Sequence, residues 1–195
     1  MQDFPNHTAA IFWFMGCNMR CLYCHNPELV LGKYKRLGFG EIDNFLNSRK
    51  SLLQGIVLSG GECTYSKKFV PFVRYLRHFG YKVKIDTNGS NPHTIESVLK
   101  DGLVDYIALD FKGPRNKYKH ITKFDGYENF ATTLGLILAN GVDYEVRTTQ
   151  HPRLLNDDDI DEMRANLLQI GATRRLMVQE YRYSPAFGEL EEDNI

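Results

Sequence analysis

Six short apolar segments, separated by stretches of helical periodicity, constrain the fold of this chain more than any other feature. The segments are rich in Val, Ile, Tyr and Phe, which favour strands. Strands that alternate with helices are typical of parallel sheets with right-handed crossovers. The pattern therefore predicts an α/β fold, either an open doubly wound sheet or an incomplete barrel. The predicted strands are residues 9–14, 55–59, 81–86, 106–110, 144–149 and 176–181.

Helix start and stop signals lie between these strands. Apolar residues recur there at helical spacing, and glycines follow several of the periodic stretches. The predicted helices are a segment from Phe69 that stops at Gly80, one from Asn91 that stops at Gly102, residues 127–140 before Gly141, one from Asn156 that stops at Gly171 and, with a weaker pattern, residues 41–53.

Length and charge limit the kinds of protein this chain can be. With 195 residues, 43% of them hydrophobic, we expect one domain over 1–195, with a core at about 9–183 and a solvated acidic tail at 189–195. The 24 basic and 24 acidic side chains cancel, so no general attraction to nucleic acid or to an anionic membrane is expected. The longest apolar run is too short to span a bilayer, and the N-terminus lacks the features of a secretory signal. We therefore expect a cytoplasmic protein.

Unusual polar residues and cysteines follow five of the predicted strands. The carboxyl ends of parallel strands meet at one rim, so these residues should surround a single opening. In chain order they are Cys17, Cys21 and Cys24 after the first strand, Gly60, Gly61 and Glu62 after the second, Asp86 and Thr87 after the third, Asp110 and Lys112 after the fourth, and Arg147 late in the fifth.

The three cysteines of the first loop suggest a metal centre. Three thiolates are one ligand short of a closed zinc site or of a fully ligated four-iron cluster. A structural zinc completed by Cys63 or His25 is one interpretation. Cys63 can also be a small buried residue, and a disulfide framework is not expected in a chain that can build a core.

The other rim residues also have ordinary interpretations. The glycine pair can form a tight turn, with the glutamate as a first-turn carboxylate of the next helix. The Asp-Thr pair can belong to a plain turn, and the two cations can be solvated. As binding groups, the glycines would admit a ligand close to the backbone, the acids would accept hydrogen bonds from ammonium or ribose groups, and the cations would bind a carboxylate.

The cysteine spacing, Cys-x3-Cys-x2-Cys with Tyr23 before the last cysteine, resembles the signature of the radical S-adenosylmethionine enzymes. The Gly-Gly-Glu of residues 60–62 resembles their second motif, although the family usually follows it with proline and this chain has Cys63. The sequence Cys-His-Asn-Pro-Glu-Leu at 24–29 narrows the resemblance to activating enzymes of glycyl-radical proteins, most closely the anaerobic ribonucleoside-triphosphate reductase activating proteins. Blocks at 86–89, 109–112 and 146–149 are also similar.

The resemblance implies a partial (β/α)6 barrel of parallel strands, open on one side, and a role for each rim residue. The cysteines would bind a [4Fe-4S] cluster whose fourth iron is left to S-adenosylmethionine. The implied contacts to S-adenosylmethionine are Tyr23 at the adenine, Gly60, Gly61 and Glu62 at the methionine ammonium, Asp86 and Thr87 near the ribose, and Lys112 and Arg147 at the carboxylate, with a monovalent cation near Asp86 and Asp110 as a weaker implication.

The activity implied by the resemblance is reductive cleavage of S-adenosylmethionine to a 5′-deoxyadenosyl radical, which makes a glycyl radical on a partner enzyme. The implied partners are a glycyl-radical protein, here anaerobic ribonucleotide reductase, and a low-potential electron donor such as flavodoxin or ferredoxin. Only one cysteine remains outside the loop, so the chain can hold a single cluster. Two alternatives are a small-molecule enzyme like 7-carboxy-7-deazaguanine synthase, in which the last cysteine is typically followed by Asp-Thr, and a non-catalytic metal-binding adaptor.

Overall fold

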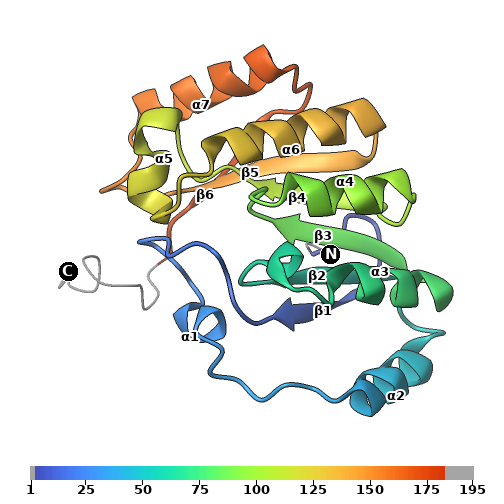
Figure 1. The fold of residues 1–195 in the computed structure, drawn as a ribbon. Coiled ribbons are helices and arrows are strands. Elements are labelled where there is room, and N and C mark those ends of the chain that lie inside the picture. Colours follow the sequence, from blue (N-terminus) through green and yellow to red (C-terminus); the bar gives the residue numbers. More distant parts are fainter. Residues whose placement is uncertain (1–2, 183–195) are drawn as a thin grey trace.

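The structure, a computed structural model, describes residues 3–182 and contains one six-stranded parallel sheet (Figure 1). The order of the strands in the sheet is their order in the chain. A doubly wound sheet reverses its strand order at a switch point, whereas a barrel wall does not. The strands are β1 (Ala9–Phe14), β2 (Gly55–Gly60), β3 (Lys82–Thr87), β4 (Tyr106–Asp110), β5 (Asp143–Gln150) and β6 (Leu176–Glu180). β1 and β6 are opposite edges of this sheet, which confirms the predicted open barrel.

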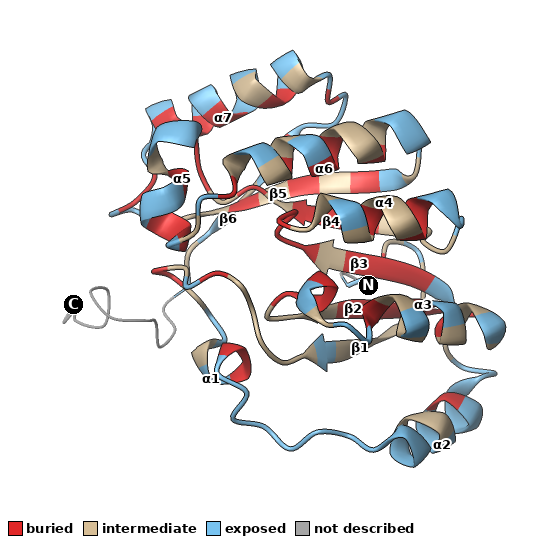
Figure 2. Ribbon diagram, viewed as in Figure 1, coloured by how far each residue is buried: buried red, intermediate tan, exposed pale blue. Residues whose placement is uncertain are grey.

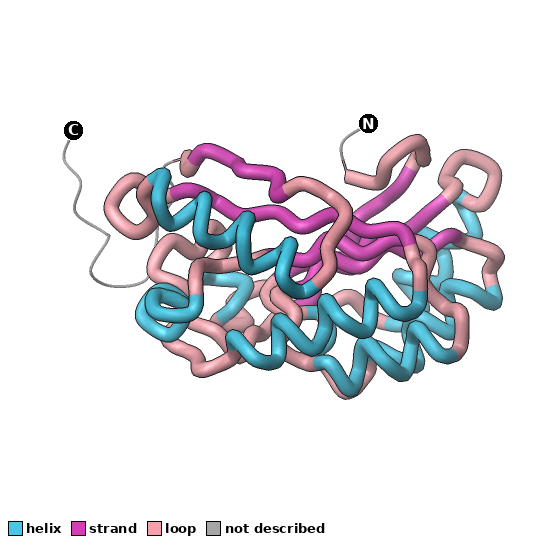
Figure 3. Tube along the Cα trace, turned by 90° about the horizontal axis from the view of Figure 1, so that it is seen from above, coloured by secondary structure: helices cyan, strands magenta, loops and turns pink. Residues whose placement is uncertain are grey.

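The helices lie on one face of the sheet, as the view from above shows (Figure 3). The other face is concave and carries no helix among the described residues, so its side chains can face a ligand. The helices are α1 (Pro27–Val30), α2 (Phe39–Arg49), α3 (Phe69–His78), α4 (Pro92–Lys100), α5 (Arg115–Thr122), α6 (Tyr127–Asn140) and α7 (Asp157–Ile170), with one 3-10 turn, η1 (Cys63–Tyr65).

The hydrophobic core fills the space between the sheet and the helices (Figure 2). Alternate residues of a strand point to opposite faces. On β3, Val83 and Ile85 are fully buried in this core, and Lys84 and Asp86 have the opposite parity. The alternation therefore assigns apolar side chains of β3 to the core and charged ones to the concave face.

Several predicted helix ends are confirmed. Gly141 and Gly171 follow α6 and α7 with φ of 78° and 99°, a left-handed conformation that glycine adopts without a steric penalty. Asn156 begins α7, where its side chain accepts a hydrogen bond from the backbone N–H of Asp159 at 2.9 Å. These local signals fix where the helices stop and where the chain returns to the sheet.

Three helical segments differ from the sequence-based expectation, and one of them, the four-residue α1, is too short to show a helical period. The helix expected at 41–53 is α2, which begins at Phe39 and ends at Arg49; Leu52 beyond its end is 62% exposed. Helix α5 was not predicted, because its polar sequence presents only Tyr118 and Ile121 as buried apolar residues. A short polar helix that buries one turn carries too weak a periodic signal.

The predicted acidic tail at 189–195 lies outside the described residues. Within residues 3–182, no helix combines the length and the hydrophobicity that a membrane span requires.

Candidate functional site

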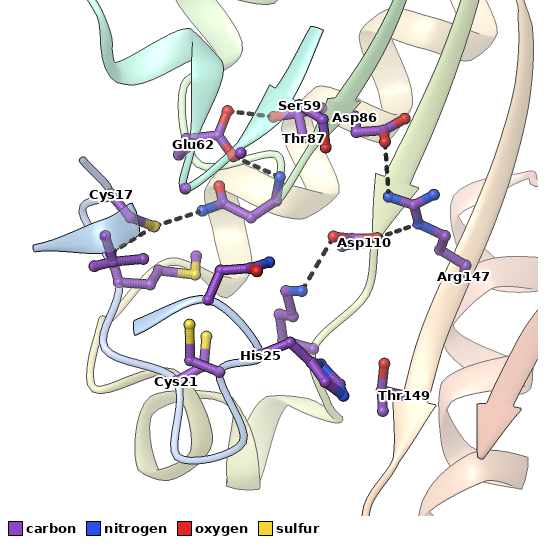
Figure 4. A pocket seen from close by; sticks show the side chains of 18 of the residues that line it. Cys17, Cys21, His25, Ser59, Glu62, Asp86, Thr87, Asp110, Arg147 and Thr149 are labelled. Atoms are coloured by element: carbon purple, nitrogen blue, oxygen red, sulfur yellow. Dashed lines mark hydrogen bonds and ion pairs between the residues drawn. The ribbon is translucent and has the colours of Figure 1, made fainter. Parts of the chain in front are cut away.

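A pocket of about 350 Å³ opens at the carboxyl ends of the strands (Figure 4). Side chains from five successive strand ends line it, as the parallel topology predicts. The structure thus brings every residue proposed from the sequence into one pocket: Cys17, Cys21, Tyr23, Cys24, Gly60, Gly61, Glu62, Asp86, Thr87, Asp110, Lys112 and Arg147.

Backbone hydrogen bonds hold the cysteine loop against α5. The N–H groups of Arg20 and Leu22 donate to the carbonyls of Thr122 and Ile121 at 2.9 and 3.0 Å. At the start of the loop, the Gly16 N–H donates to the carbonyl of Leu29 in α1 at 3.1 Å. The loop is therefore positioned by two helices, α1 and α5, neither of which was predicted from the sequence.

The environment of the cysteines favours neutral thiols when no metal is bound. Burial raises the pKa of Cys17 to about 11 and that of Cys21 to about 12, although Lys112 acts in the opposite direction on both. Burial also raises the pKa of Cys24. Metal ligation requires thiolates, so binding of a metal centre here must displace protons.

The donor set fits an iron-sulfur cluster better than a single ion. No three His, Cys, Asp or Glu side chains within residues 3–182 lie close enough together to hold one metal ion. Neither candidate fourth ligand is directed to the cysteines: Cys63 is fully buried and donates to the carbonyl of Asp86 at 3.4 Å, and His25 Nε2 lies 3.1 Å from the carbonyl of Arg182. Three separated sulfurs suit a centre larger than one ion, which a [4Fe-4S] cluster provides.

The glycine pair allows the cysteine loop and the end of β2 to touch. A Cβ on Gly61 would lie 2.1 Å from the Gly16 carbonyl oxygen, and one on Gly60 would lie 2.3 Å from that of Phe14. Gly60 also has φ of 125°, a conformation open essentially to glycine alone. The Gly61 N–H donates to Phe14 and the Glu62 N–H to Gly16, both at 2.9 Å. The close approach that the glycines permit is thus made by the neighbouring backbone.

Glu62 organises the loop after β3. Its side chain is 2% exposed and accepts hydrogen bonds from the Thr87 hydroxyl at 2.8 Å, the Asn88 N–H at 2.7 Å, and both the N–H and the hydroxyl of Thr64. Burial raises the pKa of this carboxyl against the effect of those bonds. Oε2 accepts only the Asn88 N–H among the described contacts, which leaves one oxygen able to accept a further donor from a ligand.

Asp110 joins the two predicted carboxylate-binding cations. Arg147 Nε lies 2.6 Å from Oδ1 of Asp110 (Figure 4), and Lys112 Nζ lies 3.1 Å from Oδ2 of the same carboxylate. Burial disfavours the ionised form of Asp110, but the two cations outweigh it and lower the pKa to about 2. Burial alone would lower the pKa of Lys112, yet Asp110 and other nearby groups raise it well above its usual value. Both side chains are therefore charged at neutral pH.

Lys112 and Arg147 differ in what they offer a ligand. Lys112 affects the pKa of all three loop cysteines and lies 6.0 Å from the centre of the Tyr23 ring, so it is on the cluster side of the pocket. Arg147 also contacts Asp86 at 3.4 Å. Among the described residues, Lys112 makes an ion pair with one carboxylate, that of Asp110, whereas Arg147 also contacts Asp86 and Glu145.

Polar groups without a protein partner line the same pocket. The hydroxyls of Tyr23 and Thr148 are buried and have no hydrogen-bond partner within the described chain, and Asp86 Oδ1 likewise accepts no hydrogen bond, although it lies 3.0 Å from Lys84 Nζ. Buried polar groups are normally paired, so these two hydroxyls fit a polar ligand such as S-adenosylmethionine.

Several lining residues belong to the segments that the sequence placed at the strand ends but were given no role of their own. Asn88 Nδ2 lies 3.9 Å from Cys17 Sγ and 3.3 Å from Asn18 Oδ1, so it connects the glutamate-held loop to the cysteine loop. Ser59 and Thr149 also line the pocket at the ends of β2 and β5. Their position at the carboxyl ends of predicted strands was the signal that could have identified them.

An open barrel of parallel strands with a three-cysteine loop and a polar pocket at its rim defines a class of metallocluster enzymes that bind a small polar cofactor. Comparison with known families agrees: the Radical SAM superfamily matches residues 11–167, and the chain belongs to it. Members of this superfamily use a [4Fe-4S] cluster and S-adenosylmethionine, and these are the cofactors of this radical S-adenosylmethionine enzyme.

Two relatives and one solved structure illustrate the likeness. A Methanocaldococcus jannaschii protein named “Putative glycyl-radical enzyme activating enzyme” is 37% identical over 167 residues, covering 83% of this chain and 69% of the relative. The pyruvate formate-lyase-activating enzyme of Clostridium pasteurianum is 29% identical over 176 residues, covering 87% and 72%. The structure of Streptococcus suis SuiB bound to S-adenosylmethionine superimposes with a TM-score of 0.73 at 15% identity, covering 99% of this chain and 44% of SuiB. The last comparison supports the fold alone.

Proposed function

We propose that this chain is an activating enzyme that generates a glycyl radical on a partner protein. The observation that carries the proposal is the likeness to a glycyl-radical enzyme activating enzyme over 83% of the chain, together with a pocket that holds all the expected cofactor-binding residues. The Cys-His-Asn-Pro sequence that pointed to activating enzymes continues directly into α1, whose Val30 lines the same pocket.

The bound cofactors supply the chemistry, a 5′-deoxyadenosyl radical that removes a hydrogen atom from a glycine of the partner. The chain's residues position and shield that reaction. Lys112 would present a positive charge to the S-adenosylmethionine carboxylate, and Glu62 Oε2 would accept a hydrogen bond from its ammonium. The Tyr23 ring would border the adenine. Asp86 and Thr87, which line the same pocket, would contact the ribose.

The partner we propose is anaerobic ribonucleotide reductase. The opening between β1 and β6 can admit a glycine-bearing loop from another protein, because these two edges are not paired with each other. The chain has cysteines for one cluster only, so the electron must come from a separate low-potential donor such as flavodoxin or ferredoxin.

The decisive experiment is anaerobic incubation of the reconstituted protein with S-adenosylmethionine, a reductant and the candidate reductase, followed by electron paramagnetic resonance. We expect a glycyl doublet that the Cys21→Ala variant loses and the Cys63→Ala variant keeps, since Cys63 is buried away from the pocket. A doublet that survives in Cys21→Ala would refute the cluster assignment.

The same samples separate the alternatives. S-adenosylmethionine cleavage without any glycyl signal, but with turnover of a small substrate, would favour an enzyme like 7-carboxy-7-deazaguanine synthase. Bound zinc with no cleavage would favour a non-catalytic adaptor.

A further inference from the structure

The concave face of the sheet holds a cluster of charged side chains beneath the pocket rim. Parallel register aligns Lys84 with Tyr106, Ala108 with Glu145 and Asp110 with Arg147, so these positions share one face. The charged members of the cluster are Lys84, Asp86, Asp110, Lys112, Glu145 and Arg147.

Lys84 is the buried member of this cluster. It is 1% exposed, and its Nζ lies 3.0 Å from Asp86 Oδ1, 3.6 Å from Glu145 Oε1 and 5.7 Å from the centre of the Tyr106 ring. A buried ammonium is unfavourable unless carboxylates surround it. Its surroundings therefore resemble the shell of oxygens and aromatic carbon that would receive a bound monovalent cation.

The carboxylates expected to hold a monovalent cation are already occupied. Asp86 Oδ1 contacts Lys84, and Asp86 Oδ2 contacts Arg147 at 3.4 Å. Asp110 Oδ1 contacts Arg147 at 2.6 Å, and Asp110 Oδ2 contacts Lys112 at 3.1 Å. Each of the four carboxylate oxygens thus lies within 3.4 Å of a protein ammonium or guanidinium nitrogen, although Asp86 Oδ1 makes an ion pair with Lys84 without hydrogen-bond geometry.

The net charge of the cluster also indicates that a protein cation stands where a monovalent metal ion would bind. The cluster contains three carboxylates, Asp86, Asp110 and Glu145, and three cations, Lys84, Lys112 and Arg147, so it is neutral. Without Lys84 it would carry one negative charge, which a single K⁺ or Na⁺ would balance. An ammonium and a potassium ion have the same charge and similar size.

We propose that the Lys84 ammonium takes the place of a monovalent cation beside Asp86, so that this chain binds S-adenosylmethionine without K⁺ or Na⁺. The proposal concerns cofactor binding and does not depend on the identity of the partner protein.

The test compares salts of equal ionic strength. The reconstituted protein is titrated anaerobically with S-adenosylmethionine in choline chloride, KCl or NaCl at about 0.1 M, and its melting temperature is measured in each salt. For the unsubstituted protein we expect Kd and Tm to be independent of the cation, within about twofold in Kd. A loss of about tenfold in affinity when choline replaces both K⁺ and Na⁺ would overturn the proposal.

The variant Lys84→Met removes the charge and leaves an unbranched side chain that is one heavy atom shorter. In choline we expect it to bind about tenfold more weakly and to melt lower, and KCl or NaCl to restore much of both losses. The matched control is Lys82→Met on the same strand, whose exposed ammonium contacts only His7 among the described residues at 2.9 Å and which should show no cation effect. A folded Lys84→Met protein that does not respond to K⁺ or Na⁺ would overturn the proposal. If the methionine variant does not fold, Lys84→Gln is measured in the same way. The salt comparison on the unsubstituted protein tests the proposal whether or not either variant folds.

Discussion

Substitution of Gly61 by alanine should separate the end of β2 from the cysteine loop. The new Cβ would lie 2.1 Å from the carbonyl oxygen of Gly16, 2.7 Å from its carbonyl carbon and 3.2 Å from the Cβ of Cys17. Relief of these overlaps requires a backbone movement of roughly 1 Å or more, because carbon atoms in good contact are about 3.5 Å or more apart. The atoms in the way belong to backbone, so a change of rotamer cannot relieve the clash.

The movement has an estimable cost. Overpacking of a tight site costs about 1–3 kcal/mol, and the strained hydrogen bond from the Glu62 N–H to Gly16, 2.9 Å in the intact protein, costs about 1–2 kcal/mol more. We expect Gly61→Ala to lose about 2–5 kcal/mol of the roughly 5–15 kcal/mol that stabilise a domain of this kind. Cys17 would move with the loop, so the reconstituted variant should also contain less iron.

Denaturant unfolding of the metal-free protein, followed by far-UV circular dichroism, measures the loss. Gly135→Ala is the matched control, because Gly135 lies inside α6 with no atom within 4 Å of the added Cβ; it should gain about 0.5–1 kcal/mol. If Gly61→Ala unfolds at the wild-type denaturant concentration and keeps its iron, the close approach of the two loops is not a feature of the protein.

Three further changes test the pocket. Glu62→Gln places an amide donor where both carboxylate oxygens accept hydrogen bonds, so we expect the free energy of unfolding to fall by about 2–3 kcal/mol in the same assay. An unchanged unfolding midpoint would contradict the buried hydrogen-bond network around Glu62. The pKa of Asp110 is about 2 in the folded protein, below its ordinary value of 3.8. The charged form of Asp110 therefore stabilises the metal-free protein above about pH 4, and this stabilisation disappears as the pH falls toward 2. In Asp110→Asn that part of the acid-unfolding curve should flatten, and identical curves would show that the Asp110 ion pairs do not form. Asn88→Asp places a carboxylate where the amide nitrogen lies 3.9 Å from Cys17 Sγ, which should raise the pKa of the Cys17 thiol further and reduce iron incorporation at neutral pH. The control Asn91→Asp, outside the pocket, should leave the iron content unchanged. Equal iron contents in the two variants would refute the contact between Asn88 and Cys17.

The strands and the main helices could be predicted from the sequence because each carries a strong local signal. β1 and β4 have the predicted bounds, and α6 ends before Gly141 as expected. The remaining strands differ by a residue or so at one or both ends, where pairing with a neighbouring strand decides the last residue. Helix α5 could not be predicted, since its stability comes from packing around Tyr118 and Ile121 and from holding the cysteine loop.

The pocket could be predicted as a set of residues but not as a set of contacts. Parallel strands with a known direction bring their carboxyl ends together, which is why all the proposed residues line one opening. Which oxygen meets which cation depends on side-chain packing, which the sequence pattern does not encode. The ring of ion pairs around Arg147, the role of Asn88 and the buried Lys84 therefore emerged only from the structure.

The sheet whose strands follow chain order has a consequence for biosynthesis. A ribosome releases the strands in the same order in which they pair, so each can join its neighbour as it emerges. The cysteines leave early in translation, yet the carbonyls of Ile121 and Thr122 that hold their loop, and Arg147 at the far side of the pocket, leave much later. During that interval the thiols have no completed cofactor site around them. We therefore expect the iron-sulfur cluster to be inserted only after the chain has been made as far as Arg147.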